Sequence, residues 1–182
     1  TRRISSGFFV YFLYLLLMDN FDVIIVGGGL AGLTAAIHLR KENYSVAIIE
    51  SRQYPHHKVC GEYISHEVKP YLEFLGITLP QTFQFNEILL SIEKGKALKA
   101  KLPLGGFGLS RYTLDYLLYQ RSLALGSFVF NDSVTAIDYE NDNFRVLLAS
   151  GKEYTSKFVI GAYGKRAGLD KELQRQFIEK KS

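Results

Sequence analysis

The feature that most restricts the fold is a glycine-rich turn between two apolar runs, in the stretch FDVIIVGGGLAGLTAAIHL at residues 21–39. The first run is short and rich in Val and Ile, so we predict a buried parallel strand over 21–27. Apolar residues at helical spacing predict a helix over 30–41. A strand that passes into a helix through such a turn is typical of a nucleotide-binding α/β fold.

The glycines follow the spacing Gly27-x-Gly29-x-x-Gly32, and each position has its own physical reason. The first allows the tight turn, the second lets a pyrophosphate approach the backbone, and the third lets the helix pack closely against the strand. The free N–H groups and the positive dipole end of the helix would face the phosphates. The pattern predicts a dinucleotide-binding turn, and a glycine-rich turn without function is the alternative.

A second buried strand, YSVAIIE at residues 44–50, completes a βαβ unit. Its last residue, Glu50, stands 18 residues after Gly32. A carboxylate at this distance can accept hydrogen bonds from an adenosine ribose. The fingerprint therefore predicts an adenine dinucleotide cofactor, but it does not distinguish NAD from FAD.

Beyond this unit, two more helices and an antiparallel part are expected. Both helices end before a glycine, Gly76 and Gly126, and Ser65 is the expected N-cap of the first. The helices are expected over about 65–75 and 111–125, after a polar loop over 51–65. The antiparallel hairpin is expected over about 83–109, with its turn at 94–96. Later strands are expected over 128–130, 133–140, 144–150 and 153–162. A charged helical stretch is expected over 169–182.

The N-terminal residues 1–17 precede Met18 and lead into an apolar run over 8–18. That run is shorter than the roughly 20 residues that span a bilayer, and no small-residue cleavage site follows it. We predict that Met18 is the natural start and that residues 1–17 are an upstream or non-native leader. A membrane or export segment is the alternative.

The composition excludes several classes of protein. One cysteine rules out an internal disulfide framework and favours a reducing, cytoplasmic compartment, although the N-terminal apolar run leaves membrane association open. That cysteine and four histidines show no zinc spacing, so no metal site is predicted. The net charge of +4 is spread along the chain, which argues against a nucleic-acid partner. The oligomeric state is not predicted.

Several stretches together carry a resemblance to a known family: DVIIVGGGLAGLTAAIHL with VAIIE, KVCGEYIS, LSRYTLDYLL and VIGAYGKRAGLD. They resemble the FAD-dependent oxidoreductases of the geranylgeranyl reductase type, in the wider group of flavin hydroxylases and halogenases. The resemblance runs from about Asp22 to Asp170 and implies an α/β, Rossmann-like FAD-binding domain of three layers with a β-meander crossover. This domain is expected to cover residues 18–182 and to be incomplete there. The segment at about 83–109 would belong to a mixed-sheet substrate domain.

The resemblance also implies which residues contact FAD. The glycine turn would line the pyrophosphate, Glu50 would hold the adenosine ribose, and Arg111 would reach the phosphate–ribitol region. The full set implied is Gly27, Gly29, Leu30, Ala31, Gly32, Glu50, Ser51, Arg52, Cys60, Gly61, Tyr63, Arg111 and Val134. Taken as residues alone, Cys60 could equally be an ordinary buried cysteine, and Arg52 and Lys58 surface charges near the adenosine end.

The sequence departs from the family pattern at two positions and in length. The usual Gly-Ala-Asp-Gly reads Gly161-Ala162-Tyr163-Gly164, and a tyrosine cannot supply that carboxylate. Tyr63 stands where many relatives have glycine. A third FAD segment and most of the substrate-binding sheet would come later, so we expect an N-terminal fragment of a roughly twofold longer protein.

The implied function is redox chemistry at FAD, with NAD(P)H as a candidate electron donor. The first choice is an oxidoreductase acting on an apolar, isoprenoid or polyene-like substrate. One alternative is a flavin-dependent monooxygenase or halogenase on an aromatic substrate. The other is a truncated nucleotide-binding fragment without catalysis. No catalytic residue is predicted.

Overall fold

The computed structural model describes residues 20–93 and 95–164. Its helices are α2 (Leu30–Lys41), α3 (Lys69–Leu75) and α4 (Arg111–Ala124), with a 3-10 turn, η1 (His66–Val68), before α3. Its strands are β1 (Asn20–Val26), β2 (Val46–Ile49), β3 (Tyr63–Ser65), β4 (Phe83–Leu90), β5 (Leu98–Gly108), β6 (Phe128–Phe130), β7 (Val134–Glu140), β8 (Asn143–Leu148) and β9 (Glu153–Gly161). No helix of this described part is long and apolar enough to cross a membrane.

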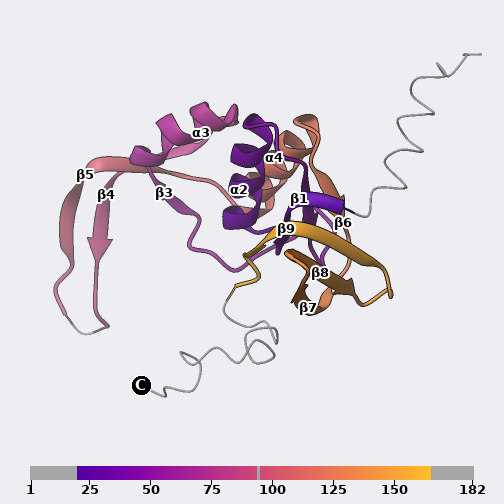
Figure 1. The fold of residues 1–182 in the computed structure, drawn as a ribbon. Coiled ribbons are helices and arrows are strands. Elements are labelled where there is room, and N and C mark those ends of the chain that lie inside the picture. Colours follow the sequence, from indigo (N-terminus) through magenta and orange to yellow (C-terminus); the bar gives the residue numbers. More distant parts are fainter. Residues whose placement is uncertain (1–19, 94, 165–182) are drawn as a thin grey trace, which may run out of the picture.

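The main sheet has the strand order β6-β2-β1-β9-β8-β7. Strands β6, β2, β1 and β9 run parallel, as expected for a βαβ unit, whereas β7, β8 and β9 form an antiparallel meander. Strand β9 belongs to both parts, because it pairs with β8 through its first residues and with β1 along most of its length. In Figure 1 strands β7 and β8 of the meander lie on the other side of the parallel strands from α2 and α4, which gives the three layers that the sequence predicts.

The parallel strands separate two apolar cores because alternate residues point to opposite faces. In β1, Val23 and Ile25 belong to the core under the helices, together with Leu33 of α2. Their neighbours Ile24 and Val26 belong to the second core, on the side of the meander. Burial on both faces explains why the strand is a continuous apolar run rather than an alternating one.

A second sheet, with the order β3-β5-β4, stands apart from the first. The β4–β5 hairpin projects away from the helices in Figure 1, and several of its apolar side chains are exposed, including Leu89 and Leu98. The base of β5 is anchored, because Phe107 is fully buried in the core under the helices. Assignment of this hairpin to a substrate domain stays a prediction.

Most element boundaries agree with the sequence predictions, and the differences have local causes. Helix α3 ends at Gly76, which has the left-handed φ of +79° that favours glycine, as predicted. Ser65 occupies the predicted N-cap position, at the start of η1, but its side chain makes no capping hydrogen bond. The loop over 51–65 is not wholly irregular, because it ends in β3. The helix predicted for 169–182 lies outside the described residues.

Candidate cofactor-binding site

A cleft of about 920 Å³ opens at the carboxyl ends of β1, β2 and β9. Backbone hydrogen bonds fix these ends to one another: the Gly27 N–H donates to the Ile49 carbonyl, and the Ala162 N–H to the Val26 carbonyl. The carboxyl edge of a parallel sheet is where ligands of this fold class bind. The predicted residues that line the cleft are Gly27, Gly29, Leu30, Ala31, Glu50, Ser51, Arg52, Arg111 and Val134.

The three motif glycines have different surroundings in the structure. Gly27 has φ +103°, and a Cβ there would lie 2.5 Å from the carbonyl oxygen of Ala162. A Cβ on Gly32 would overlap the Gly27 carbonyl, so this position allows the close contact between helix and strand. A Cβ on Gly29 would meet no atom nearer than 3.4 Å. The first and third glycines therefore serve packing, whereas Gly29 faces the open cleft.

The positive end of α2 points at the same place. Gly29 is the N-cap residue, no side chain caps this helix end, and its first turn contains no acidic residue. Two cations lie beside it: a Cβ on Gly29 would be 3.4 Å from Lys58 Nζ and 4.0 Å from Arg111 Nη2. Backbone N–H groups, a helix dipole and two cations together form a site suited to a phosphate or diphosphate.

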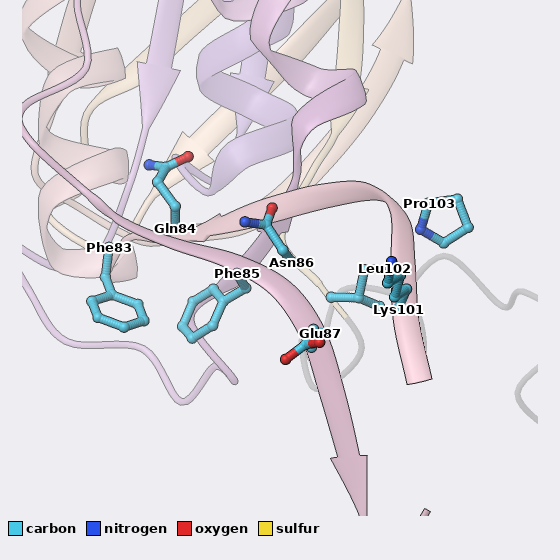
Figure 2. Close-up of a pocket in the computed structure, with 8 residues that line it drawn as sticks. All are labelled: Phe83, Gln84, Phe85, Asn86, Glu87, Lys101, Leu102 and Pro103. Atoms are coloured by element: carbon cyan, nitrogen blue, oxygen red, sulfur yellow. The ribbon is translucent and has the colours of Figure 1, made fainter. Parts of the chain in front are cut away.

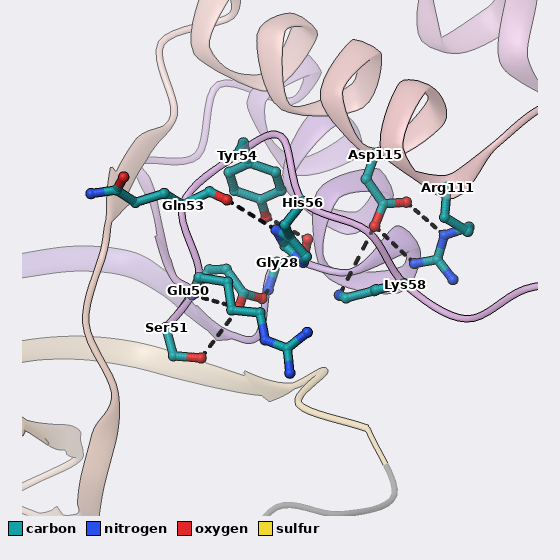
Figure 3. A network of polar contacts seen from close by, with 10 residues as sticks. Gly28, Glu50, Ser51, Gln53, Tyr54, His56, Lys58, Arg111 and Asp115 are labelled. Atoms are coloured by element: carbon teal, nitrogen blue, oxygen red, sulfur yellow. Dashed lines mark hydrogen bonds and ion pairs between the residues drawn. The ribbon is translucent and has the colours of Figure 1, made fainter.

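Glu50 is 8% exposed and has a structural task that the sequence did not reveal. Its carboxylate accepts hydrogen bonds from the Gly28 N–H (2.8 Å) and the Arg52 N–H (3.0 Å), and so fastens the glycine turn to the end of β2. Figure 3 shows Glu50 beside Gly28, with the cleft cations Lys58 and Arg111 near them. An ionised carboxylate can accept about four hydrogen bonds, so it keeps acceptor capacity for ribose hydroxyls.

Tyr54 is a residue of the site that the sequence analysis missed. Its hydroxyl donates to the Gly28 carbonyl, and its ring stacks on Tyr119 with centroids 4.3 Å apart. Burial, and then the negative charge of Glu50, raise the pKa of Tyr54 far above its ordinary value. The phenol therefore stays protonated, and its hydrogen bond to the Gly28 carbonyl stabilises the glycine turn.

Four predicted residues do not line the cleft. Gly32 is buried in packing, whereas Cys60, Gly61 and Tyr63 are exposed. The interpretation of Cys60 as a buried apolar residue is therefore wrong. The Tyr63 hydroxyl donates to the Gly105 carbonyl at 3.1 Å, so this side chain packs on the second sheet instead. FAD contacts of Cys60, Gly61 and Tyr63 stay predictions.

The structure adds cleft residues that were not expected there. Lys58, which could have been a surface charge, lines the cleft and lies 3.9 Å from Asp115. Asp132 lines it too, and hydrogen bonds from Ser150 and Ser133 lower the pKa of Asp132. Tyr163, in place of the usual aspartate, also lines the cleft, and a Cβ on Gly161 would lie 2.9 Å from its ring.

A second hollow, of about 750 Å³, lies on the β4–β5 hairpin. Figure 2 shows Phe83, Phe85, Leu102 and Pro103 around it, with polar side chains of the same two strands. The pairing of β4 and β5 shifts register between Phe85 and Glu87, which bends the hairpin here. This hollow is far more open to solvent than a packed core and contains no residue of the glycine turn.

The sequence model of the pyridine nucleotide-disulphide oxidoreductase family matches residues 21–169. The chain belongs to this family. The match begins at the second residue of β1 and therefore includes the whole glycine turn, Glu50 and both cleft cations. This oxidoreductase domain thus has the FAD-binding α/β fold that the sequence predicts.

One curated relative and two solved structures illustrate what the chain is similar to. The FAD-dependent monooxygenase penE of Penicillium thymicola is 29% identical over 169 residues, which cover 86% of this chain and 35% of that protein. The crystal structure of the halogenase PltM in complex with phloroglucinol and FAD has a TM-score of 0.71 at 22% identity, covering 85% of this chain and 36% of that one. For the p-nitrophenol 4-monooxygenase PnpA from Pseudomonas putida DLL-E4 the TM-score is 0.73 at 17% identity, with coverages of 86% and 44%.

Three conclusions follow from these comparisons. The solved structures share the fold with this oxidoreductase domain, at identities too low to show more. The chain spans about a third of the length of the curated relatives it matches. The monooxygenase penE, the halogenase PltM and the monooxygenase PnpA are not named as geranylgeranyl reductases. The assignment to the geranylgeranyl reductase type therefore stays a prediction.

Proposed function

We propose that this chain binds FAD in the cleft and provides the cofactor domain of a flavin-dependent monooxygenase. One observation carries the proposal: an uncapped helix N-terminus, two cations and a buried carboxylate meet at the glycine turn of a sequence whose relatives include FAD-dependent monooxygenases. The alternative prediction of a monooxygenase or halogenase is therefore better supported than a reductase of isoprenoid substrates.

The residues present fit the cofactor. Lys58, Arg111 and the N-terminus of α2 would hold the pyrophosphate, whose negative charge matches this donor set. Glu50 would accept hydrogen bonds from the adenosine ribose, and Val134 would present its backbone to the adenine. When bound, FAD supplies hydride and oxygen chemistry that no side chain of the protein can perform. The chain's own contribution is to bind the cofactor and to fix its orientation.

The substrate is proposed to be aromatic. The names of two structural neighbours include the aromatic compounds phloroglucinol and p-nitrophenol. In this chain the hollow on the β4–β5 hairpin carries two phenylalanines, Phe83 and Phe85, whose rings lie 5.1 Å apart. Aromatic surfaces of this kind suit a flat apolar ligand. NAD(P)H is the proposed electron donor.

An apolar isoprenoid or polyene substrate is the second candidate. It is favoured by the loop KVCGE at 58–62, which resembles that of the geranylgeranyl reductases. The two candidates differ in their use of oxygen, because a monooxygenase consumes O₂ with each product and a reductase does not. A nucleotide-binding piece without catalysis would bind the cofactor but show neither reaction.

The test begins with the cofactor. The purified protein is denatured, and the released small molecule is identified by absorbance and mass. FAD in the extract, and oxygen consumption with NAD(P)H that rises with an aromatic substrate, would support the proposal. NAD without flavin would contradict the assignment of FAD, and substrate reduction without oxygen uptake would favour the reductase.

A further inference from the structure

Asp115 is a carboxylate of α4 that is 1% exposed and lies directly behind the two cations of the cleft. Its Oδ1 accepts a hydrogen bond from Arg111 Nε at 2.7 Å, and its Oδ2 accepts one from Arg111 Nη2 at 2.9 Å. Lys58 Nζ lies 3.9 Å from Oδ2. Figure 3 shows Asp115 with Arg111 on one side and Lys58 on the other.

The two cations come from separate parts of the chain. Lys58 lies in the loop after β2, and Arg111 is the first residue of α4. Their side chains are 28% and 19% exposed, so each keeps a face toward the cleft. A guanidinium has five N–H donors, and Asp115 uses two of them, so about three remain for another acceptor.

A buried carboxylate between two cations serves a physical purpose. Lys58 and Arg111 repel each other, and both are long side chains with many rotamers. The charge of Asp115 offsets the repulsion, and its two bonds to Arg111 fix the plane of the guanidinium. A site whose cations are fixed before the ligand arrives loses less conformational entropy on binding.

We infer that Asp115 is a positioning residue that holds Arg111 and Lys58 at the N-terminus of α2 so that the pair binds the diphosphate of the cofactor. The hydrogen bonds to Asp115 also raise the pKa of Arg111 above its ordinary value, so the guanidinium stays charged. This role rests on the proposed binding of FAD, and it adds a residue that does not line the cleft.

The experiment compares Asp115→Asn with the wild-type chain by titration with FAD and with ADP. FAD binding is followed by quenching of flavin fluorescence, and ADP binding by calorimetry. The asparagine keeps the size of the side chain but weakens both bonds to Arg111, so affinity for both ligands should fall about 10-fold. Asp22→Asn is the matched control, because Asp22 accepts hydrogen bonds from Ser45 away from the cleft. This control should bind both ligands as the wild type does.

A double-mutant cycle separates positioning from general support of the fold. If Asp115 acts mainly through Arg111, then Asp115→Asn should lower affinity much less in an Arg111→Ala background than in the wild type, because only its effect through Lys58 remains. Equal losses of affinity with and without Arg111 would overturn the inference, and so would tighter ADP binding by Asp115→Asn. Should that variant fail to fold, Arg111→Lys keeps the charge without the paired bonds, and its binding with wild-type affinity would overturn the inference as well.

The outcome also separates this inference from the proposed function. A wild-type chain that binds neither FAD nor ADP overturns both. A wild-type chain that binds both ligands, together with an Asp115→Asn variant of unchanged affinity, overturns only the role of Asp115.

Discussion

The contrast between Gly29 and Gly32 gives the sharpest test of the site. The same change, glycine to alanine, should have opposite consequences at two positions of one motif. At Gly32 the added Cβ overlaps the backbone carbonyl of Gly27, which cannot move aside without shifting the turn. At Gly29 the nearest atom is Lys58 Nζ at 3.4 Å, the end of a flexible side chain.

The magnitudes follow from these surroundings. Overpacking costs about 1–3 kcal/mol, and an atom pushed against a fixed carbonyl belongs at the upper end. The higher helix propensity of alanine returns about 1 kcal/mol, so Gly32→Ala should lose about 2 kcal/mol of unfolding free energy. For a domain of this size that loss lowers the melting temperature by about 4–8 °C. Gly29→Ala should lose less than about 1 kcal/mol, the usual cost of a poorer N-cap.

For the affinity for FAD, we expect Gly29→Ala to be the more damaging of the two changes. A Cβ on Gly29 occupies the space through which a diphosphate would approach the helix N–H groups. Loss of hydrogen bonds to a charged group costs about 1.5–3 kcal/mol, so FAD should bind roughly 10- to 100-fold more weakly. Gly32→Ala, measured below its melting temperature, should keep more of its affinity. Urea denaturation gives the stabilities and flavin fluorescence quenching gives the affinities.

The reasoning fails under either of two results. One is Gly32→Ala with wild-type stability, which would mean that the helix and strand are not in close contact. The other is Gly29→Ala with wild-type affinity for FAD, which would mean that the cofactor does not approach this turn.

Three further changes test other parts of the argument. Glu50→Ala should weaken FAD binding by about 1.5–3 kcal/mol in a titration and, because the Gly28 N–H loses its acceptor, should also lower the urea midpoint. Unchanged stability would contradict the structural role of Glu50. Hydrogen bonds from Ser45 lower the pKa of Asp22, so its contribution is present above the ordinary pKa of about 3.9 and is lost as the pH falls through the lowered value. Asp22→Asn should therefore be less stable than the wild type at pH 7, by under about 1 kcal/mol, and the difference should vanish in acid; a difference that persists at pH 2 would refute this. Leu33→Ala, at a fully buried position, should cost about 2–5 kcal/mol in the same denaturation assay, and a cost below 1 kcal/mol would mean that the core is packed differently.

The local part of the fold was predictable because it depends on patterns within short windows. The apolar run before Gly27, the helical spacing after it and the glycines at helix and hairpin ends each carry their own signature. The turn between β7 and β8 is an example, since Asn141 and Asp142 have positive φ values of 50° and 59° that asparagine and aspartate tolerate. Strand β3 was missed because it has only three residues and exists only through its pairing with Gly106–Gly108 of β5.

The candidate site was predictable only in part, for a related reason. The glycine spacing predicts a phosphate-binding turn, but the side chains that stabilise this turn come from distant positions in the sequence. Tyr54 contacts Gly28 and Tyr119, and nothing in its own neighbourhood of sequence indicates either contact. The ion pair of Asp115 with Arg111 is indicated by the sequence, because the two residues are four positions apart on a helix, where opposite charges pair. The burial of Asp115, which makes the pair relevant to the cleft, could not be inferred from that spacing.

Strand β9 belongs to both the parallel strands and the antiparallel meander, and this position affects when the cofactor cleft forms during folding. Strand β1 pairs with β9 between partners as distant as Val26 and Gly161, and the Gly27 turn packs against Ala162. Among the described residues, the first strand must therefore pair with the last one before the cleft is complete. Contacts this distant in sequence form slowly, because a long loop must close first. During synthesis, a cofactor that binds in this cleft would find its three sides only after β9 has emerged, so it should bind after these strands have paired rather than act as the template for their pairing.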